Sequence, residues 1–211
     1  MEIKIDKSPL GEPYMPPERK IECVTVFGQI EGHYYLSDNQ KTTKYEELIP
    51  RLFELEQSDT VKGILLLLNT VGGDVEAGLS IAELIAGMTK PTASLVIGGS
   101  HSIGVPLAVC TEHSFIAPSA VLTVHPVRIS GTVIGAPQSY RYFERMQQRI
   151  SDFIISHSDC NRVKLEELMF AKKDIATDIG SILDGRDAVD AGLIDSVGTI
   201  GECFSYLENR I

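Results

Sequence analysis

One short apolar run limits the folds open to this chain more than any other feature. Residues 64–68 read Ile-Leu-Leu-Leu-Leu, and a pair of glycines follows at 72–73. Five consecutive aliphatic residues are too few to span a membrane. A run of this length bounded by turn residues is typical of a strand buried on both faces of a parallel sheet. Because parallel strands need crossover connections, usually helices, the run predicts an α/β protein.

The segments on either side of this run alternate between strand and helix patterns. β-Branched residues at 23–28 predict a strand, and leucines at helical spacing predict a helix over 45–55. After the run we expect an amphipathic helix over 75–88 and an apolar strand at 93–97. This order is that of repeated βαβ units.

The alternation continues toward the C-terminus. It repeats around 105–110, an apolar segment of helical length, and 121–124, a strand. A long helix is expected over 138–157, where apolar residues recur at helical spacing, and shorter helices at 165–169 and 185–191.

The chain is expected to form one domain with one tail. Its 211 residues and 23.1 kDa allow one sizeable core and are too few for two ordinary enzyme domains. Residues 1–20 carry four prolines and mixed charge, a composition that disfavours both a helix and a central strand. We interpret 1–20 as an arm and 21–211 as the folded domain.

Charge and composition exclude several classes of partner. The chain has 19 Lys and Arg against 29 Asp and Glu, a net charge of −10, and no Lys/Arg-rich run. Nucleic acid and anionic membrane surfaces are therefore not expected as partners. The first thirty residues are charged throughout and lack the apolar segment of a secretion signal, so we expect a cytoplasmic protein without a membrane span.

The cysteines do not suggest a metal site or a disulfide framework. Cys23, Cys110, Cys160 and Cys203 lie far apart, and none forms a Cys-x-x-Cys pair. We expect small buried hydrophobic side chains or unreactive surface thiols. No His, Asp or Glu cluster has metal-ligand spacing and no phosphate-binding loop is present, so no cofactor is expected.

Two turns at strand ends carry residues suited to chemistry. The first, at 69–74, has paired glycines that can expose backbone N–H groups to a developing negative charge; taken alone, it is more simply explained as a plain turn with Asp74 as helix N-cap. The second, at 98–104, has small residues around Ser102 that can present its hydroxyl from a tight turn. Ser100 is a rival nucleophile. His101 is the less favoured base, because adjacent side chains usually point apart.

A histidine ends the strand expected at 121–124. His125 is followed by a proline, and an imidazole at a strand end is suited to remove a serine proton near neutral pH. A structural role is the alternative. His33, His113 and His157 are expected to be surface or internally satisfied histidines.

Taken in order, these features resemble a known family. Residues 69–73 are similar to the Asn-Ser-Pro-Gly-Gly turn of the proteolytic subunit of the Clp protease, and 101–104 to its Ala-Ser-Met-Gly nucleophile turn. Residues 124–126 are similar to its Ile-His-Gln-Pro, and 188–195 to its closing Ala-x-x-x-Gly-Leu-Ile-Asp. Over residues 22–197 the chain thus resembles the ClpP/crotonase superfamily.

The resemblance implies a fold and a set of site residues. The fold would be a spiral of parallel strands with flanking helices and a protruding handle helix over 138–157. An aromatic stripe on that helix fits either an oligomer seam or a core face, and its members are Tyr142, Phe143 and Phe153. Ser102 would be the nucleophile and His125 its base. The backbone N–H groups of Gly73 and Ile103 would form the oxyanion hole.

The third triad member is less well defined by the resemblance. An ungapped alignment from the C-terminal motif places Gly180 where the family has its aspartate. Asp178 is the residue we expect to serve, Asp174 is a further candidate, and an absent acid is the alternative.

The expected function is that of a serine endopeptidase. It would cleave peptides or unfolded proteins through an acyl-enzyme and act as a homo-oligomeric ring, without metal or nucleotide. The chain departs from the family in having Val71 in place of a proline and in its proline-rich arm. These two features resemble a translocation-enhancing branch of the family from spore-forming bacteria. This resemblance implies a link to protein export, and it leaves open whether an ATPase is a partner. The alternatives are a crotonase-type acyl-CoA enzyme and a non-catalytic scaffold or adaptor.

Overall fold

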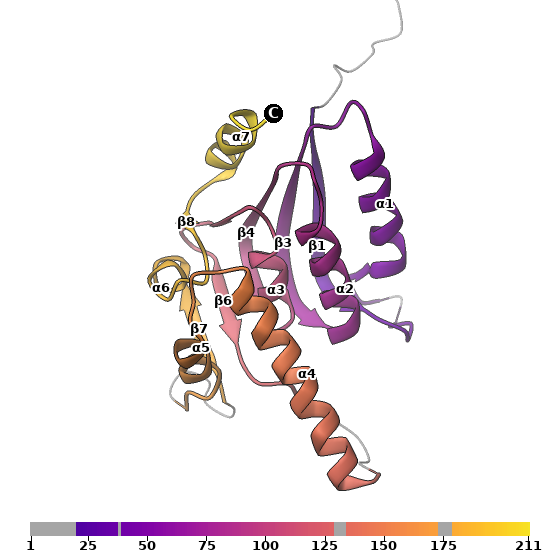
Figure 1. The fold of residues 1–211 in the computed structure, drawn as a ribbon, viewed down its shortest axis with the longest axis vertical. Coiled ribbons are helices and arrows are strands. Elements are labelled where there is room, and N and C mark those ends of the chain that lie inside the picture. The colour runs from indigo at the N-terminus through magenta and orange to yellow at the C-terminus, as the bar shows by residue number, and fades with distance from the viewer. Residues whose placement is uncertain (1–19, 38, 129–133, 173–178) are drawn as a thin grey trace, which may run out of the picture.

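The computed structural model describes residues 20–37, 39–128, 134–172 and 179–211 (Figure 1). The arm expected over 1–20 therefore lies outside the described residues, apart from Lys20, and so do Asp174 and Asp178. The described chain forms a mostly parallel sheet with helices on both faces, so the predicted α/β class is confirmed.

The sheet has a main path and a branch. The main path has the order β2-β1-β3-β4-β5-β8, with parallel neighbours throughout: β1 (Ile21–Glu31), β2 (Thr42–Lys44), β3 (Gly63–Gly73), β4 (Thr92–His101), β5 (His113–Ile116) and β8 (Ser196–Val197). The branch is formed by β6 (Val121–Val124), which pairs parallel with β4 and antiparallel with β7 (Ser181–Asp184).

Seven helices are present in the described residues: α1 (Tyr45–Gln57), α2 (Val75–Ala86), α3 (Gly104–Val109), α4 (Ala136–Ser156), α5 (Arg162–Met169), α6 (Gly185–Asp190) and α7 (Ile200–Glu208). Every helix expected from the sequence forms, within a few residues of its expected ends. None of the helices in the described part of the chain is long and apolar enough to cross a bilayer.

The apolar run at 64–68 forms the first half of β3, a strand as predicted, and contributes to two cores. Ile64, Leu66 and Leu68 pack into the main core, whereas Leu65 points to the other face of the sheet and packs with Leu207 of α7. Figure 1 shows α1 and α2 to the right of the sheet and α7 to its left. The continuous apolar run thus reflects burial on both faces.

The pairing of β4 changes along its length, and this change positions the candidate site. The first half of β4 (93–96) pairs with β5, and the second half (99–101) pairs with β6. His101 is the Cα partner of Thr123 in this second half. Because parallel strands end at the same edge of a sheet, the residues after β4 and after β6 meet there: Ser102 and His125.

Helix α4 extends beyond the body of the molecule, as the predicted handle should (Figure 1). Its C-terminal part is packed, and Phe153 is buried in the core. Its N-terminal part is exposed at Tyr142. The stripe predicted as either seam or core thus has a buried end at Phe153 and an exposed end at Tyr142. Arg149 joins α4 to α2 through two hydrogen bonds to Glu76, at 2.6 and 3.0 Å.

The cysteines behave as predicted. All four are free thiols; Cys110, Cys160 and Cys203 are buried, and Cys23 is exposed. Burial raises the pKa of each thiol, that of Cys203 to about 12. Since the thiolate is the reactive form, the buried thiols are inert near neutral pH.

Candidate active site

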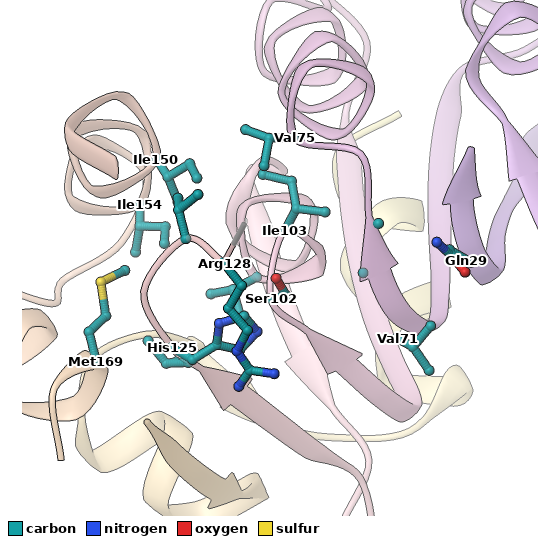
Figure 2. Close-up of a pocket in the computed structure, with 15 residues that line it drawn as sticks. Gln29, Val71, Val75, Ser102, Ile103, His125, Arg128, Ile150, Ile154 and Met169 are labelled. Atoms are coloured by element: carbon teal, nitrogen blue, oxygen red, sulfur yellow. The ribbon is translucent and has the colours of Figure 1, made fainter. Parts of the chain in front are cut away.

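The ends of β3, β4 and β6 surround a cavity of about 360 Å³. Gly73 reaches it from β3, Ser102 and Ile103 from the turn after β4, and His125 from the end of β6. Figure 2 shows the hydroxyl of Ser102 and the ring of His125 facing the same hollow. The structure thus brings four of the five residues predicted for the site together, and the fifth, Asp178, lies outside the described residues.

Ser102 occupies an unusual backbone conformation. Its φ is 59°, in the left-handed region that residues with a side chain avoid at a cost of roughly 1–2 kcal/mol. Two backbone hydrogen bonds hold the turn: Ser102 N donates to Thr123 O at 2.9 Å, and Val105 N donates to Ser102 O at 3.0 Å. A strained turn between a strand and a helix is the geometry that exposes a nucleophilic side chain.

The two neighbours of Ser102 that compete for a catalytic role are engaged elsewhere. Ser100 is fully buried, and its hydroxyl donates to the carbonyl of Gly104 at 2.7 Å. His101 pairs through Nδ1 with the hydroxyl of Thr123, also at 2.7 Å. Neither residue is among the described residues that line the cavity, which agrees with the preference for Ser102 and His125.

The ring of His125 has a defined tautomer. Its Nδ1 lies 2.7 Å from the carbonyl oxygen of Pro126, and since a carbonyl only accepts, Nδ1 carries the hydrogen. When the ring is neutral, the other nitrogen, Nε2, carries the lone pair. This tautomer is the one that a general base requires.

Gly72 and Gly73 form a turn that requires glycine. Gly73 has a φ of 154°, and a Cβ there would lie 2.1 Å from the carbonyl oxygen of Ile30. The hydroxyl of Thr70 organises the turn by accepting from Gly72 N at 3.0 Å and donating to Gly28 O at 2.6 Å. The turn lies against the nucleophile, since a Cβ at Gly72 would lie 2.8 Å from Cβ of Ser102.

Asp74 caps the next helix. Its carboxylate accepts a hydrogen bond from Ala77 N at 2.9 Å, at the N-terminus of α2. The role of Asp74 as an N-cap, one of the two interpretations open from the sequence, is confirmed. The cap fixes the start of α2 directly after the glycine turn.

Gly180 lies directly against the base. A Cβ at Gly180 would lie 2.8 Å from Cβ of His125 and 2.6 Å from the carbonyl of Val124. This position is the one that the ungapped alignment assigned to the triad aspartate. Gly180 supplies no carboxylate and leaves no room for one without movement of His125.

The rest of the cavity wall comes from helices that the motifs did not indicate. Ile150 and Ile154 of α4 and Met169 of α5 form an apolar end (Figure 2). Arg128 also lines the cavity. The helical spacing of apolar residues predicted the helix, but only the fold shows that Ile150 and Ile154 face a cavity.

The other histidines have local roles, as expected. The ring of His113 pairs with Ser196 Oγ at 3.1 Å and stacks on Tyr206. His157 stacks on Phe153. His33 lies at the surface near Tyr45. Within the described ranges, no three His, Cys, Asp or Glu side chains are grouped so that they could hold a metal ion.

Comparison with known proteins finds one family model and several relatives. The sequence model of the Clp protease family matches residues 18–201. The chain is 52% identical to the translocation-enhancing protein TepA of Halalkalibacterium halodurans over 204 residues, which cover 96% of this chain and 80% of the relative. It is 27% identical to the ATP-dependent Clp protease proteolytic subunit 1 of Protochlamydia amoebophila over 165 residues, covering 77% of this chain and 78% of the relative. The corresponding subunit of Chlamydia muridarum is 26% identical over 157 residues, 72% of this chain and 78% of its own.

Proposed function

The chain belongs to the Clp protease family, and from this premise we propose that it is a serine endopeptidase that cleaves peptides or unfolded polypeptides through an acyl-enzyme. One observation carries the proposal. Ser102, in a turn with positive φ, shares a cavity with His125, whose Nδ1 hydrogen bond leaves Nε2 able to accept a proton.

The proposed reaction follows from these two side chains. His125 Nε2 accepts the proton of Ser102 as Oγ attacks the substrate carbonyl, and the imidazolium then gives that proton to the leaving amine. Water activated by the same ring hydrolyses the acyl-enzyme. The Pro126 carbonyl stabilises the proton on Nδ1 throughout the cycle.

The backbone N–H groups of Gly73 and Ile103 are proposed as the oxyanion hole. The N–H of Gly72 is occupied by Thr70, and that of Asp74 donates to Ile30 O in β1 at 3.0 Å. Successive N–H groups of an extended strand point to opposite sides, so the N–H of Gly73 is directed away from β1, toward the turn that carries Ser102. Each donor of such a pair contributes on the order of 10² to 10³ in rate.

Asp178 is the proposed third member, and Asp174 is the second candidate. A carboxylate at Nδ1 of His125 would share or replace the hydrogen bond to the Pro126 carbonyl. Asp178→Asn is expected to lower turnover by a factor on the order of 10⁴. Full activity of Asp178→Asn would rule out Asp178 as the third member. Asp174, or the Pro126 carbonyl alone, would then orient the ring of His125.

Assembly and location are part of the proposal. We propose a homo-oligomeric ring in the cytoplasm. Its contact surface would be the outer half of α4, where Tyr140 and Tyr142 are exposed, together with the exposed Ile134 just before the helix. Enclosed sites would admit only unfolded chains. The similarity to a translocation-enhancing protein supports a role near protein export.

A non-catalytic scaffold is the second candidate, and the glycine at 180 favours it. The two candidates are separated by comparing the wild type with Ser102→Ala on short fluorogenic peptides and on an unfolded protein. Turnover is expected to require Ser102 and to be unchanged in Ser80→Ala, a matched control on the exposed side of α2. No Ser102-dependent turnover in any oligomeric state would favour the scaffold.

A further inference from the structure

A hydrogen-bonded pair beside the nucleophile is not used by the reaction proposed above. The ring of His101 is linked to the hydroxyl of Thr123 at 2.7 Å, between Nδ1 and Oγ1. The two residues are Cα partners in the parallel ladder between β4 and β6. The pair therefore joins the strand that ends in the nucleophile to the strand that ends in the base.

Thr123 forms hydrogen bonds with both Ser102 and His101. Its carbonyl accepts from the N–H of Ser102 at 2.9 Å, and its hydroxyl pairs with the ring of His101. The imidazole of His101 is confined from the other side by Gly99, where a Cβ would lie 2.3 Å from Nε2. A side chain at 99 would meet the ring, so the glycine leaves the space in which the ring of His101 lies.

The pair also adjoins the base. Thr123 and His125 are two residues apart, so their side chains point to the same side. Burial lowers the pKa of His101, and the nearby His125 lowers it further. Both effects favour the neutral form of His101, the form that places no charge against an imidazolium at His125.

We propose that His101 and Thr123 form a cross-strand clamp that holds the Ser102 turn in register with His125, with His101 as a positioning residue rather than a base. The proposal rests on the serine peptidase activity proposed above. It also accounts for a histidine at a place where the turn it resembles has alanine.

The test separates the clamp from packing. Thr123→Val removes the hydroxyl but keeps the shape and the carbonyl that accepts from Ser102. We expect kcat, and the rate at which a fluorophosphonate labels Ser102, to fall about tenfold with KM within about twofold, as for the loss of one positioning hydrogen bond. Thr123→Ser should restore both rates. His101→Ala should lower them as much as Thr123→Val does, and the double variant should show no further loss.

His113→Ala is the matched control, because its ring also pairs with a hydroxyl, that of Ser196, but lies on β5 outside the cavity lining. It is expected to keep wild-type kcat and labelling. Wild-type rates in Thr123→Val, or an equal loss of rate in His113→Ala, would overturn the clamp but not the proposed peptidase function. If His101→Ala fails to fold, Thr123→Val decides. Absence of Ser102 labelling in the wild-type protein would overturn the clamp together with the peptidase function.

Discussion

The turns that end β3 and β4 meet at one cavity but are built from different residues. At the end of β3, two glycines adopt φ values of 87° and 154°. At the end of β4, Ser102 adopts a φ of 59°, and among the described residues it is the one non-glycine residue with positive φ. Glycine accepts such values without steric cost, whereas serine does not.

The difference indicates what each turn contributes. A glycine suffices where the backbone N–H is the useful group, as proposed for Gly73. Serine is kept at 102 despite roughly 1–2 kcal/mol of strain, which is understandable if its hydroxyl is needed. Strain at a position that a glycine would relieve therefore points to a function of the side chain.

Ser102→Gly is the strongest test of this difference between the turns that end β3 and β4. Removing the hydroxyl is expected to lower peptide turnover by a factor on the order of 10⁴ to 10⁶. Relief of the positive φ should at the same time raise the free energy of unfolding by about 0.5–1 kcal/mol, because the strain exceeds the entropy cost of glycine. Denaturant unfolding beside a peptidase assay measures both. A less stable Ser102→Gly protein would contradict the strain argument.

Gly72→Ala tests the contact between the two turns. The added Cβ would lie 2.7 Å from the carbonyl oxygen of His101 and 2.8 Å from Cβ of Ser102, so the nucleophile must shift. We expect kcat/KM to fall on the order of 100-fold. The control is Gly201→Ala in α7, where the nearest neighbouring atom is 4.0 Å from the new Cβ and activity should not change. Wild-type activity of Gly72→Ala would show that the turns are not tightly packed.

Gly180→Ala extends the comparison to the base. The Cβ of the new side chain would lie 2.8 Å from that of His125, and its displacement should lower kcat about tenfold. Gly180→Asp should lower activity at least as much, because the same contact precedes any benefit from a carboxylate. Increased activity of Gly180→Asp would contradict this expectation and show that position 180 can supply the triad aspartate, as the ungapped alignment implies.

The smallest expected effect concerns pH. The pKa of His101 is lowered from 6.5 in the folded protein, first by burial and then by His125. At His101 the unfolded chain therefore binds a proton more readily, so the contribution of this residue to the free energy of unfolding should be constant above about pH 7 and decline as the pH falls below about 6.5. The decline between about pH 7 and pH 5 should be smaller in His101→Gln than in the wild type. Identical pH dependence in the two proteins would contradict the assigned shift.

The sequence alone predicted the parts of the fold that depend on local pattern. The apolar run at 64–68 marked β3 because burial on both faces leaves no polar positions. Asp74 was recognised as a possible cap because N-caps have a short local signature. Helix α7 was missed although Thr199 and Glu202 form a capping box, which is the signal that could have found it.

Other features depend on contacts between distant segments. Strands β2, β5, β7 and β8 have two to four residues each, too few for a periodicity to show. The division of β4 between two partners follows from tertiary packing, and Gly98 and Gly99, at which the pairing changes, do not by themselves identify the second partner. The approach of Gly180 to His125 arises from the antiparallel pairing of β6 with β7. For the same reason the apolar end of the cavity and the link between His101 and Thr123 were not predicted.

The central claim is that Ser102 is an activated nucleophile. It is tested most directly by treating the purified protein with diisopropyl fluorophosphate and locating the adduct by peptide mass spectrometry. The account predicts one diisopropylphosphoryl group per subunit on the peptide that contains Ser102, and no adduct in Ser102→Ala. It also predicts strongly slowed labelling in His125→Ala. An unlabelled wild-type protein, as expected of a scaffold or an acyl-CoA enzyme, or an adduct on another serine would contradict it.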